Sequence, residues 1–162
     1  MPPISDSQRA ARIKAVQEHF HIENSHDLDA VMDTFGNTCS FLANNELHEG
    51  RDAVRAFYGE FFRGFPDLRF DIKRLHVGDE AIPVEMVLSG THSGPWFGIP
   101  PTGHRFEIPA CAVFIFDEDD KIAVSVATLT QPSCCANSVC CRRQANDVWS
   151  RPLSLLLSHN PP

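Results

Sequence analysis

The sequence predicts an α+β domain in which a curved antiparallel sheet wraps around three N-terminal helices. Apolar residues recur with helical spacing up to Pro66, and from Leu68 onward they alternate with polar residues as they do on strands. The predicted strands follow one another through turns rather than through crossover helices, which is typical of α+β domains. Such a sheet forms a cone around the helices, and we expect a ligand pocket inside it.

Three amphipathic helices are predicted in the first 65 residues. The first begins with a capping box at residues 5–8, and its apolar stripe recurs at three- and four-residue steps at Ile13, Val16 and Phe20. The second helix extends over residues 27–35 and has acidic residues in its first turn. The third has the strongest pattern, because six apolar residues between 54 and 65 follow helical spacing before Pro66 ends the helix.

Three strands are predicted after the helices, over residues 68–73, 81–92 and 105–116. The last of these is apolar on both faces, because Cys111, Val113 and Ile115 alternate with a second apolar set. Helices can cover only one of the two faces. We therefore expect a second subunit to cover the outer face, which predicts a homodimer.

Composition limits the classes of partner. The chain has 162 residues, 43% of them hydrophobic, so it can bury the core of one domain. Its 14 Lys and Arg residues against 21 Asp and Glu residues give a net charge of −7. This charge gives no electrostatic basis for binding nucleic acid or an anionic membrane, and we expect neither partner.

The chain divides into two unlike parts at residue 131. Residues 1–131 carry 11 basic and 20 acidic residues, a net charge of −9, whereas residues 132–162 carry 3 and 1, a net charge of +2. Four of the six cysteines lie in the second part, at Cys134, Cys135, Cys140 and Cys141. We predict a folded domain over 1–131 and a divergent, disordered tail over 132–162, in a protein of the reducing cytoplasm. A zinc site in the tail is the alternative, although vicinal cysteines have poor geometry for four ligands.

Several motifs resemble those of one family. They are His48-Glu49-Gly50, the helix end Phe65-Pro66-Asp67-Leu68, and Gly90-Thr91-His92-Ser93-Gly94 followed by Gly98-Ile99-Pro100-Pro101-Thr102-Gly103. In this order and spacing they are similar to the SnoaL-like polyketide cyclase (ester cyclase) family of the nuclear-transport-factor-2-like (NTF2-like) superfamily, over about residues 8–122. The resemblance implies a cone-shaped α+β fold, a homo-oligomer built on the outer sheet face and no metal or organic cofactor. It also implies acid–base ring closure of a polyketide ester by intramolecular aldol chemistry.

The sequence departs from this family at a position that matters for catalysis. Ala112 falls where polyketide cyclases of this type place the aspartate that moves the proton. Glu85 and Glu107 do not replace it, because their odd positions on the strands point away from the pocket face. The last strand, which follows Lys121-Ile122, also looks shortened.

His92 is the predicted catalytic residue. It continues the apolar face of the strand over 81–92, at the end where the pocket should open. An imidazole titrates near neutral pH and can therefore move a proton to or from a substrate. The alternative is a structural role, in which His92 bonds a backbone carbonyl group and fixes the loop that follows.

The predicted substrate-binding residues surround the same pocket. Trp96 and Phe97 lie in a Gly- and Pro-flanked loop that can present aromatic surface to a flat apolar ligand. Tyr58 can donate a hydrogen bond to a ligand carbonyl, and Asn44 and His48 follow an apolar segment and can line the cavity. Each of these residues also has a structural explanation. The two aromatic residues can simply pack within their loop, and the phenol of Tyr58 can bond the backbone. Asn44 and His48 can belong to an ordinary polar loop.

The sequence therefore predicts a cofactor-free cyclase or isomerase that uses general acid–base catalysis on an apolar, polyketide-like or ester molecule. The alternative is a non-catalytic ligand-binding or regulatory module of the same fold. His92 favours the enzyme, and Ala112 favours the module.

Overall fold

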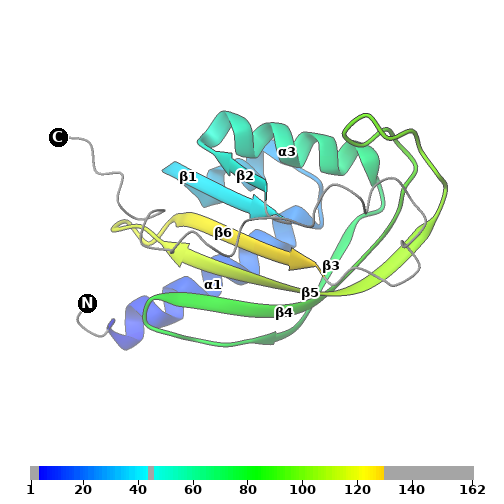
Figure 1. Ribbon diagram of the computed structural model, residues 1–162. Coiled ribbons are helices and arrows are strands. Elements are labelled where there is room, and N and C mark those ends of the chain that lie inside the picture. The colour runs from blue at the N-terminus through cyan, green and yellow to red at the C-terminus, as the bar shows by residue number, and fades with distance from the viewer. Residues whose placement is uncertain (1–3, 44–45, 130–162) are drawn as a thin grey trace. The chain divides into compact units, whose positions relative to one another are not determined.

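The computed structural model describes residues 4–43 and 46–129. The helices are α1 (Asp6–Glu23), α2 (Leu28–Thr34) and α3 (Arg51–Gly64). The strands are β1 (Phe35–Ala43), β2 (Glu46–Glu49), β3 (Arg69–Leu75), β4 (Ala81–Thr91), β5 (Arg105–Phe116) and β6 (Ile122–Leu129). Figure 1 shows the long curved strands β3 to β6 beside α1 and α3. The predicted α+β fold is confirmed.

The sheet has the strand order β2-β1-β6-β5-β4-β3. Strands β3 to β6 form an antiparallel meander, whereas β1 pairs in parallel with β6. The expectation of a purely antiparallel sheet is therefore wrong at one pair. No hairpin joins β1 to β6, since α3 and four strands separate them in the chain, so nothing in the connection enforces an antiparallel pairing.

The helix predictions hold for α1 and α3 and need a correction for α2. Ser5 and Gln8 form the expected capping box of α1. The expected helix over 27–35 is shorter, because Asp27 is its N-cap and Phe35 is already the first residue of β1. Phe35 fits the helical spacing of the residues before it, but an apolar residue at a boundary fits a strand equally well.

Strands β1 and β2 precede the point at which the sequence analysis placed the start of the sheet. In β1 the pairing with β6 shifts register between Phe35 and Ser40, and two adjacent exposed residues interrupt the alternation there. A bulge of this kind breaks the period-two alternation by which a strand is recognised in a sequence. Strand β2 has only four residues and is too short to produce such a pattern.

The core lies between the helices and the inner face of the sheet. Strand β4 contributes Ile82, Val84, Met86 and Leu88, which are all buried, as its alternation predicts. Across the sheet from Val84, three alanines follow one another in register: Ala112, Ala127 and Ala43. The inner face therefore carries small side chains along this row.

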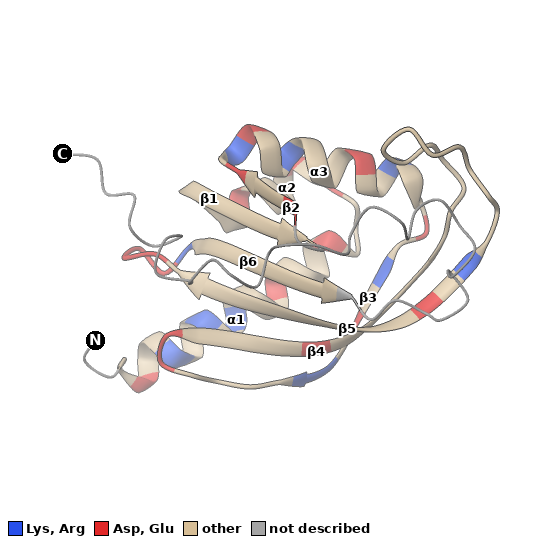
Figure 2. Ribbon diagram, viewed as in Figure 1, with Lys and Arg blue, Asp and Glu red and all other residues tan. Residues whose placement is uncertain are grey.

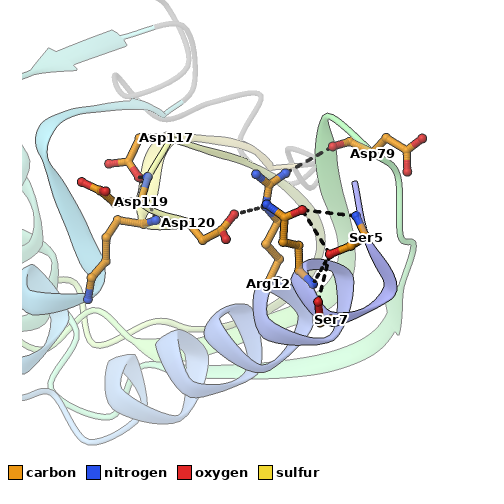
Figure 3. Close-up of polar contacts among 9 residues, drawn as sticks. Ser5, Ser7, Arg12, Asp79, Asp117, Asp119 and Asp120 are labelled. Carbon is orange, nitrogen blue, oxygen red and sulfur yellow. Dashed lines mark hydrogen bonds and ion pairs between the residues drawn. The ribbon is translucent and has the colours of Figure 1, made fainter. Parts of the chain in front are cut away.

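Charged side chains lie mainly at the rim of the domain. Figure 2 shows few of them on β4, β5 and β6, whereas the turn over 117–121 and the exposed side of α3 carry many. At the start of α1, the guanidinium group of Arg12 donates a hydrogen bond of 2.7 Å to Asp120 in this turn (Figure 3). This contact fixes α1 to the β5–β6 hairpin. Within the described residues no helix is long and apolar enough to span a membrane.

The loop from β4 to β5 reaches the end of α3, as Figure 1 shows. The backbone N–H groups of Ser93 and Gly94 both donate to the carbonyl oxygen of Gly64, at 3.0 Å. Carbonyl groups in the last turn of a helix have no partner within the helix, so the loop satisfies one of them. At Gly94 a Cβ atom would collide with the carbonyl oxygen of Arg63, and at Gly64 it would lie 2.9 Å from Trp96.

We expect Gly94→Ala to destabilise the fold, because the added methyl group must displace the backbone of α3. The free energy of unfolding, measured by chemical denaturation, should fall by about 1–3 kcal/mol, as is typical of an overpacked site. Ser93→Ala, at the exposed neighbouring position, is the matched control and should leave stability close to wild type. Equal stability of the two variants would contradict this close approach.

Candidate active site

His92 lies at the first position after β4, and its environment fixes the ring. Its backbone bonds His104 and Gly103 at the other end of the loop, so the loop is closed at its base. The side chain is 8% exposed, and Nδ1 lies 3.2 Å from the hydroxyl oxygen of Thr102. The other ring nitrogen, Nε2, is buried and has no hydrogen-bond partner among the described residues. His92 therefore has one anchored nitrogen and one free for a ligand.

Trp96 lies beside His92 and has the same kind of free group. The two ring centroids are 6.5 Å apart, and the indole Nε1 is buried with no hydrogen-bond partner in the described part of the chain. Phe65 holds both rings, with centroid distances of 5.2 Å to His92 and 5.1 Å to Trp96. An indole N–H can only donate, so this loop places a fixed donor next to the imidazole.

Phe97 and His48 join the same aromatic surface through α3. Phe97 is 48% exposed, and its ring lies 6.0 Å from that of Phe57. The His48 ring, on β2, lies 4.7 Å from Phe57 and 6.3 Å from Phe41. Its Nε2 atom is also buried without a hydrogen-bond partner among the described side chains and backbone. Burial lowers the pKa of His48 below its ordinary value of 6.5, and the Glu46 carboxylate opposes that shift.

Tyr58 packs on Phe41 and Phe57, the rings that hold His48, but makes no ring contact with the loop residues in the described structure. It is on a different stripe of α3 and is buried against Phe41 and Phe62. Its ring faces His19 at 6.5 Å. Burial, followed by the charge of Glu23, raises the pKa of the phenol well above its ordinary value. Asn44, the remaining predicted binding residue, lies outside the described residues, as do the tail and its four cysteines.

A buried polar cluster on α1 was missed by the sequence analysis. His19 and Glu23 are 1% and 3% exposed, and His19 Nε2 lies 3.3 Å from Glu23 Oε1. The signal was present, because the two residues follow Val16 by three and seven positions and so continue the apolar stripe of the helix. A histidine and a glutamate on a core-facing stripe are unusual and point to a specific role.

A hollow elsewhere on the domain does not coincide with any predicted site residue. It has a volume of about 810 Å³ and lies between the start of α1 and the β3–β4 turn, near Gln8, Arg12 and His76. The cations beside it are already paired, as Figure 3 shows for Arg12. No group of three or more His, Cys, Asp or Glu side chains within 4–43 and 46–129 could hold a metal ion.

We expect the fold to lose stability as pH falls below 6.5, in part through His48. The unfolded chain binds a proton at His48 near pH 6.5, but the folded state resists it because its pKa is lowered, so acid favours unfolding. The His48 ring should titrate by NMR with a midpoint below 6.5. Glu46→Gln, which removes the opposing charge, should lower that midpoint further. A midpoint at or above 6.5 would show that His48 is not desolvated.

Comparisons with known proteins place the chain in a family. The model of the SnoaL-like domain matches residues 16–125, which is more than half of the chain. A comparison with curated proteins found no match.

Solved structures share the fold at low sequence identity. A SnoaL-like polyketide cyclase from Jannaschia sp. CCS1 has a TM-score of 0.68 at 21% identity, covering 80% of this chain and 91% of that one. The epoxide hydrolase/cyclase-like enzyme SalBIII, described in pyran ring formation in the polyether salinomycin, has a TM-score of 0.66 at 21% identity, covering 79% and 95%. A SnoaL-like polyketide cyclase from Agrobacterium tumefaciens strain C58 has a TM-score of 0.62 at 17% identity, covering 74% and 91%. The resemblance seen in the motifs is confirmed: the chain belongs to the SnoaL-like domain family.

Proposed function

We propose that the protein is a cyclase or isomerase that moves a proton on a small apolar carbonyl compound, such as a polyketide-like ketone or ester. The family supports small-molecule cyclase or isomerase chemistry in general. The observation that carries the proposal is the pair of buried, partner-free nitrogen atoms, Nε2 of His92 and Nε1 of Trp96, on one loop. Leaving such a group without a partner costs about 1–3 kcal/mol, a cost that a bound ligand would remove.

The chemistry of the pair fits a carbonyl oxygen. Thr102 binds Nδ1 of His92, which leaves Nε2 to face a ligand, and Trp96 supplies a second donor. We propose that His92 exchanges a proton with the substrate as a general acid or base, since an imidazole does this near neutral pH. The aromatic rings of Phe57, Phe97 and His48 would contact the apolar part of the ligand.

The rival function is a non-catalytic binding or regulatory module. Ala112 favours it, because the inner face of β5 carries no carboxylate at the position where polyketide cyclases of this type have one. Both functions use the same aromatic surface. They differ in whether bound ketone is converted, so turnover separates them.

We also propose a homodimer formed through the outer face of the sheet. Val113 and Ile115 of β5 are half-buried in the single chain, and Val113 is next to Val126 of β6. A partner that covers this apolar strip would remove it from water. The free thiols of Cys39 and Cys111 fit a cytoplasmic location, which we propose on that ground.

We expect His92→Gln to abolish turnover while the fold is retained. Turnover of a panel of polycyclic ketones and esters should fall by about 10²–10⁴-fold, the usual contribution of a general acid or base. His104→Gln, at an exposed position of the same loop, is the matched control and should remain active. Ligand-induced thermal shifts without any turnover in the wild-type protein would instead favour the binding module, and full activity of His92→Gln would refute the role of His92.

We expect Val113→Lys to convert the dimer into a monomer, because it places a charge at the centre of the proposed interface. Light scattering coupled to size-exclusion chromatography should give twice the chain mass for the wild type and the single mass for the variant. Ala10→Lys, at an exposed position of α1 away from this face, controls for the added charge. A monomeric wild type would refute the dimer.

A further inference from the structure

The buried pair His19 and Glu23 is not used by the function proposed above. Both side chains lie in the core, where an unpaired charge is very costly. Four aromatic rings surround the imidazole, those of Phe20, Phe35, Tyr58 and Phe114, with centroid distances of 5.3–6.5 Å. Glu23 Oε2 is buried and has no hydrogen-bond partner among the described residues.

The hydrogen bonds of Thr34 determine which nitrogen of His19 carries a proton. The Thr34 hydroxyl donates its single hydrogen to the carbonyl oxygen of Val31, at 2.6 Å. Its oxygen therefore accepts in the 2.7 Å contact with His19 Nδ1, which must carry a hydrogen. A neutral His19 then presents a lone pair at Nε2.

This lone pair faces another acceptor. His19 Nε2 lies 3.3 Å from Glu23 Oε1, and two groups that both lack a hydrogen would repel each other at this distance in the core. Nε2 has no formed hydrogen bond to any described residue, so the two atoms are close without a bond between them. A proton shared by the pair, either on Nε2 beside a carboxylate or on the carboxyl group beside a neutral imidazole, would remove this repulsion.

The titratable groups next to this pair are proton donors in their neutral form. Tyr58 approaches from α3, and Cys39 of β1 lies near Tyr58. Burial raises the pKa of both the phenol and the thiol. No lysine or arginine in the described ranges hydrogen-bonds to His19 or Glu23. The raised pKa of Tyr58 also reflects a hydrogen bond with Glu23, so its hydroxyl group is the donor next to this carboxyl group.

The pair lies on the helix-covered side of the sheet, close to the row of small side chains. His19 contacts Phe114, which is two residues from Ala112 on the same face of β5. Ala112 is in register with Ala127, which pairs with Ala43. His92 extends the inner face of β4, so it lies on the same side of the sheet.

We propose that Glu23, His19 and Tyr58 form an interior acid–base site for a small apolar carbonyl compound, where Glu23 does the work of a carboxylate at position 112. Glu23 Oε2 takes a proton from the carbon next to the carbonyl group. The electron pair of that C–H bond becomes the C=C bond of an enolate, and the carbonyl π electrons move to the oxygen, which accepts a hydrogen bond from Tyr58. Return of the proton to another carbon gives an isomer. Attack of the enolate carbon on a second carbonyl group of the same molecule gives a ring, whose alkoxide then takes the proton from Glu23.

His19 acts in this site as a positioning residue. It orients Glu23 through the 3.3 Å contact and stabilises the carboxylate when it holds the shared proton itself. The inference rests on the proposed carbonyl chemistry and assigns its base to α1.

The test is proton exchange at a ketone, which needs no knowledge of the natural substrate. The full chain is incubated with 2-tetralone in D₂O, and loss of the signal from the hydrogens next to the carbonyl group is followed by NMR. We expect exchange to be faster with the wild type than in buffer alone. In Glu23→Gln this acceleration should fall by at least about 100-fold. Glu18→Gln, at an exposed position of the same helix, is the matched control and should exchange like the wild type.

Tyr58→Phe is the second variant, because it keeps the ring and removes only the hydroxyl group. Its exchange rate should fall by about 100-fold, as expected for the loss of one donor to the enolate oxygen. Thermal unfolding will show whether Glu23→Gln folds. If it does not fold, Tyr58→Phe decides the test. The interior site would be overturned if Tyr58→Phe and a folded Glu23→Gln exchanged at the wild-type rate while His92→Gln lost exchange. That result would leave the proposed function intact. A wild type that does not accelerate exchange would overturn both.

Discussion

The packing of α3 against the inner side of the sheet determines where every candidate site residue lies. The helix presents two aromatic stripes. One contains Phe57, Phe61 and Phe65 and holds the rings of His48, Trp96 and His92. The other contains Tyr58 and Phe62, which contact His19 on α1 and His26 in the turn after it. The end of α3 also receives the loop that carries His92 and Trp96, through hydrogen bonds to Gly64. One helix thus separates a loop-side group of polar atoms from an interior group.

Both groups contain polar atoms that the fold leaves without partners. Nε2 of His92 and Nε1 of Trp96 lie on the loop side, and Nε2 of His19 and Oε2 of Glu23 lie in the interior. Each such atom weakens the fold, since burial removes its bonds to water and nothing in the described chain replaces them. Polar groups of this kind gather where a protein binds or converts a ligand. Both groups lie on one side of the sheet, and they are where we propose that His92 and Glu23 act as acid–base residues.

Much of the fold was predictable from the sequence, because α1, α3 and the strands β3 to β5 have clean periodicity. Strand β5 has the predicted limits of Arg105 and Phe116, and β4 ends one residue before His92. Strands β1 and β2 were missed because one contains a register shift and the other has four residues. Sequence patterns report on neighbours along the chain, so they also missed the parallel pairing of β1 with β6.

The candidate site was predictable only in part, for the same reason. The position of His92 at the end of an apolar face followed from alternation alone. Tyr58 lies away from His92 because its place on the helix points it toward α1, and this depends on how the helices pack. Glu23 was missed because the family resemblance places the carboxylate on a strand, at the position of Ala112, whereas Glu23 is on a helix. Its partner Tyr58 is 35 residues distant in the sequence and meets it only in the folded chain.

The interior site depends on Thr34, which fixes a hydrogen on Nδ1 of His19 and so leaves Nε2 to face Glu23. The most direct measurement is the ¹⁵N NMR spectrum of the His19 ring in labelled protein near neutral pH. We predict a hydrogen on Nδ1 in every protonation state, with Nε2 either bare or sharing its hydrogen with Glu23. A neutral ring that carries its only hydrogen on Nε2 would contradict it, since His19 would then donate to Glu23 as an ordinary structural histidine.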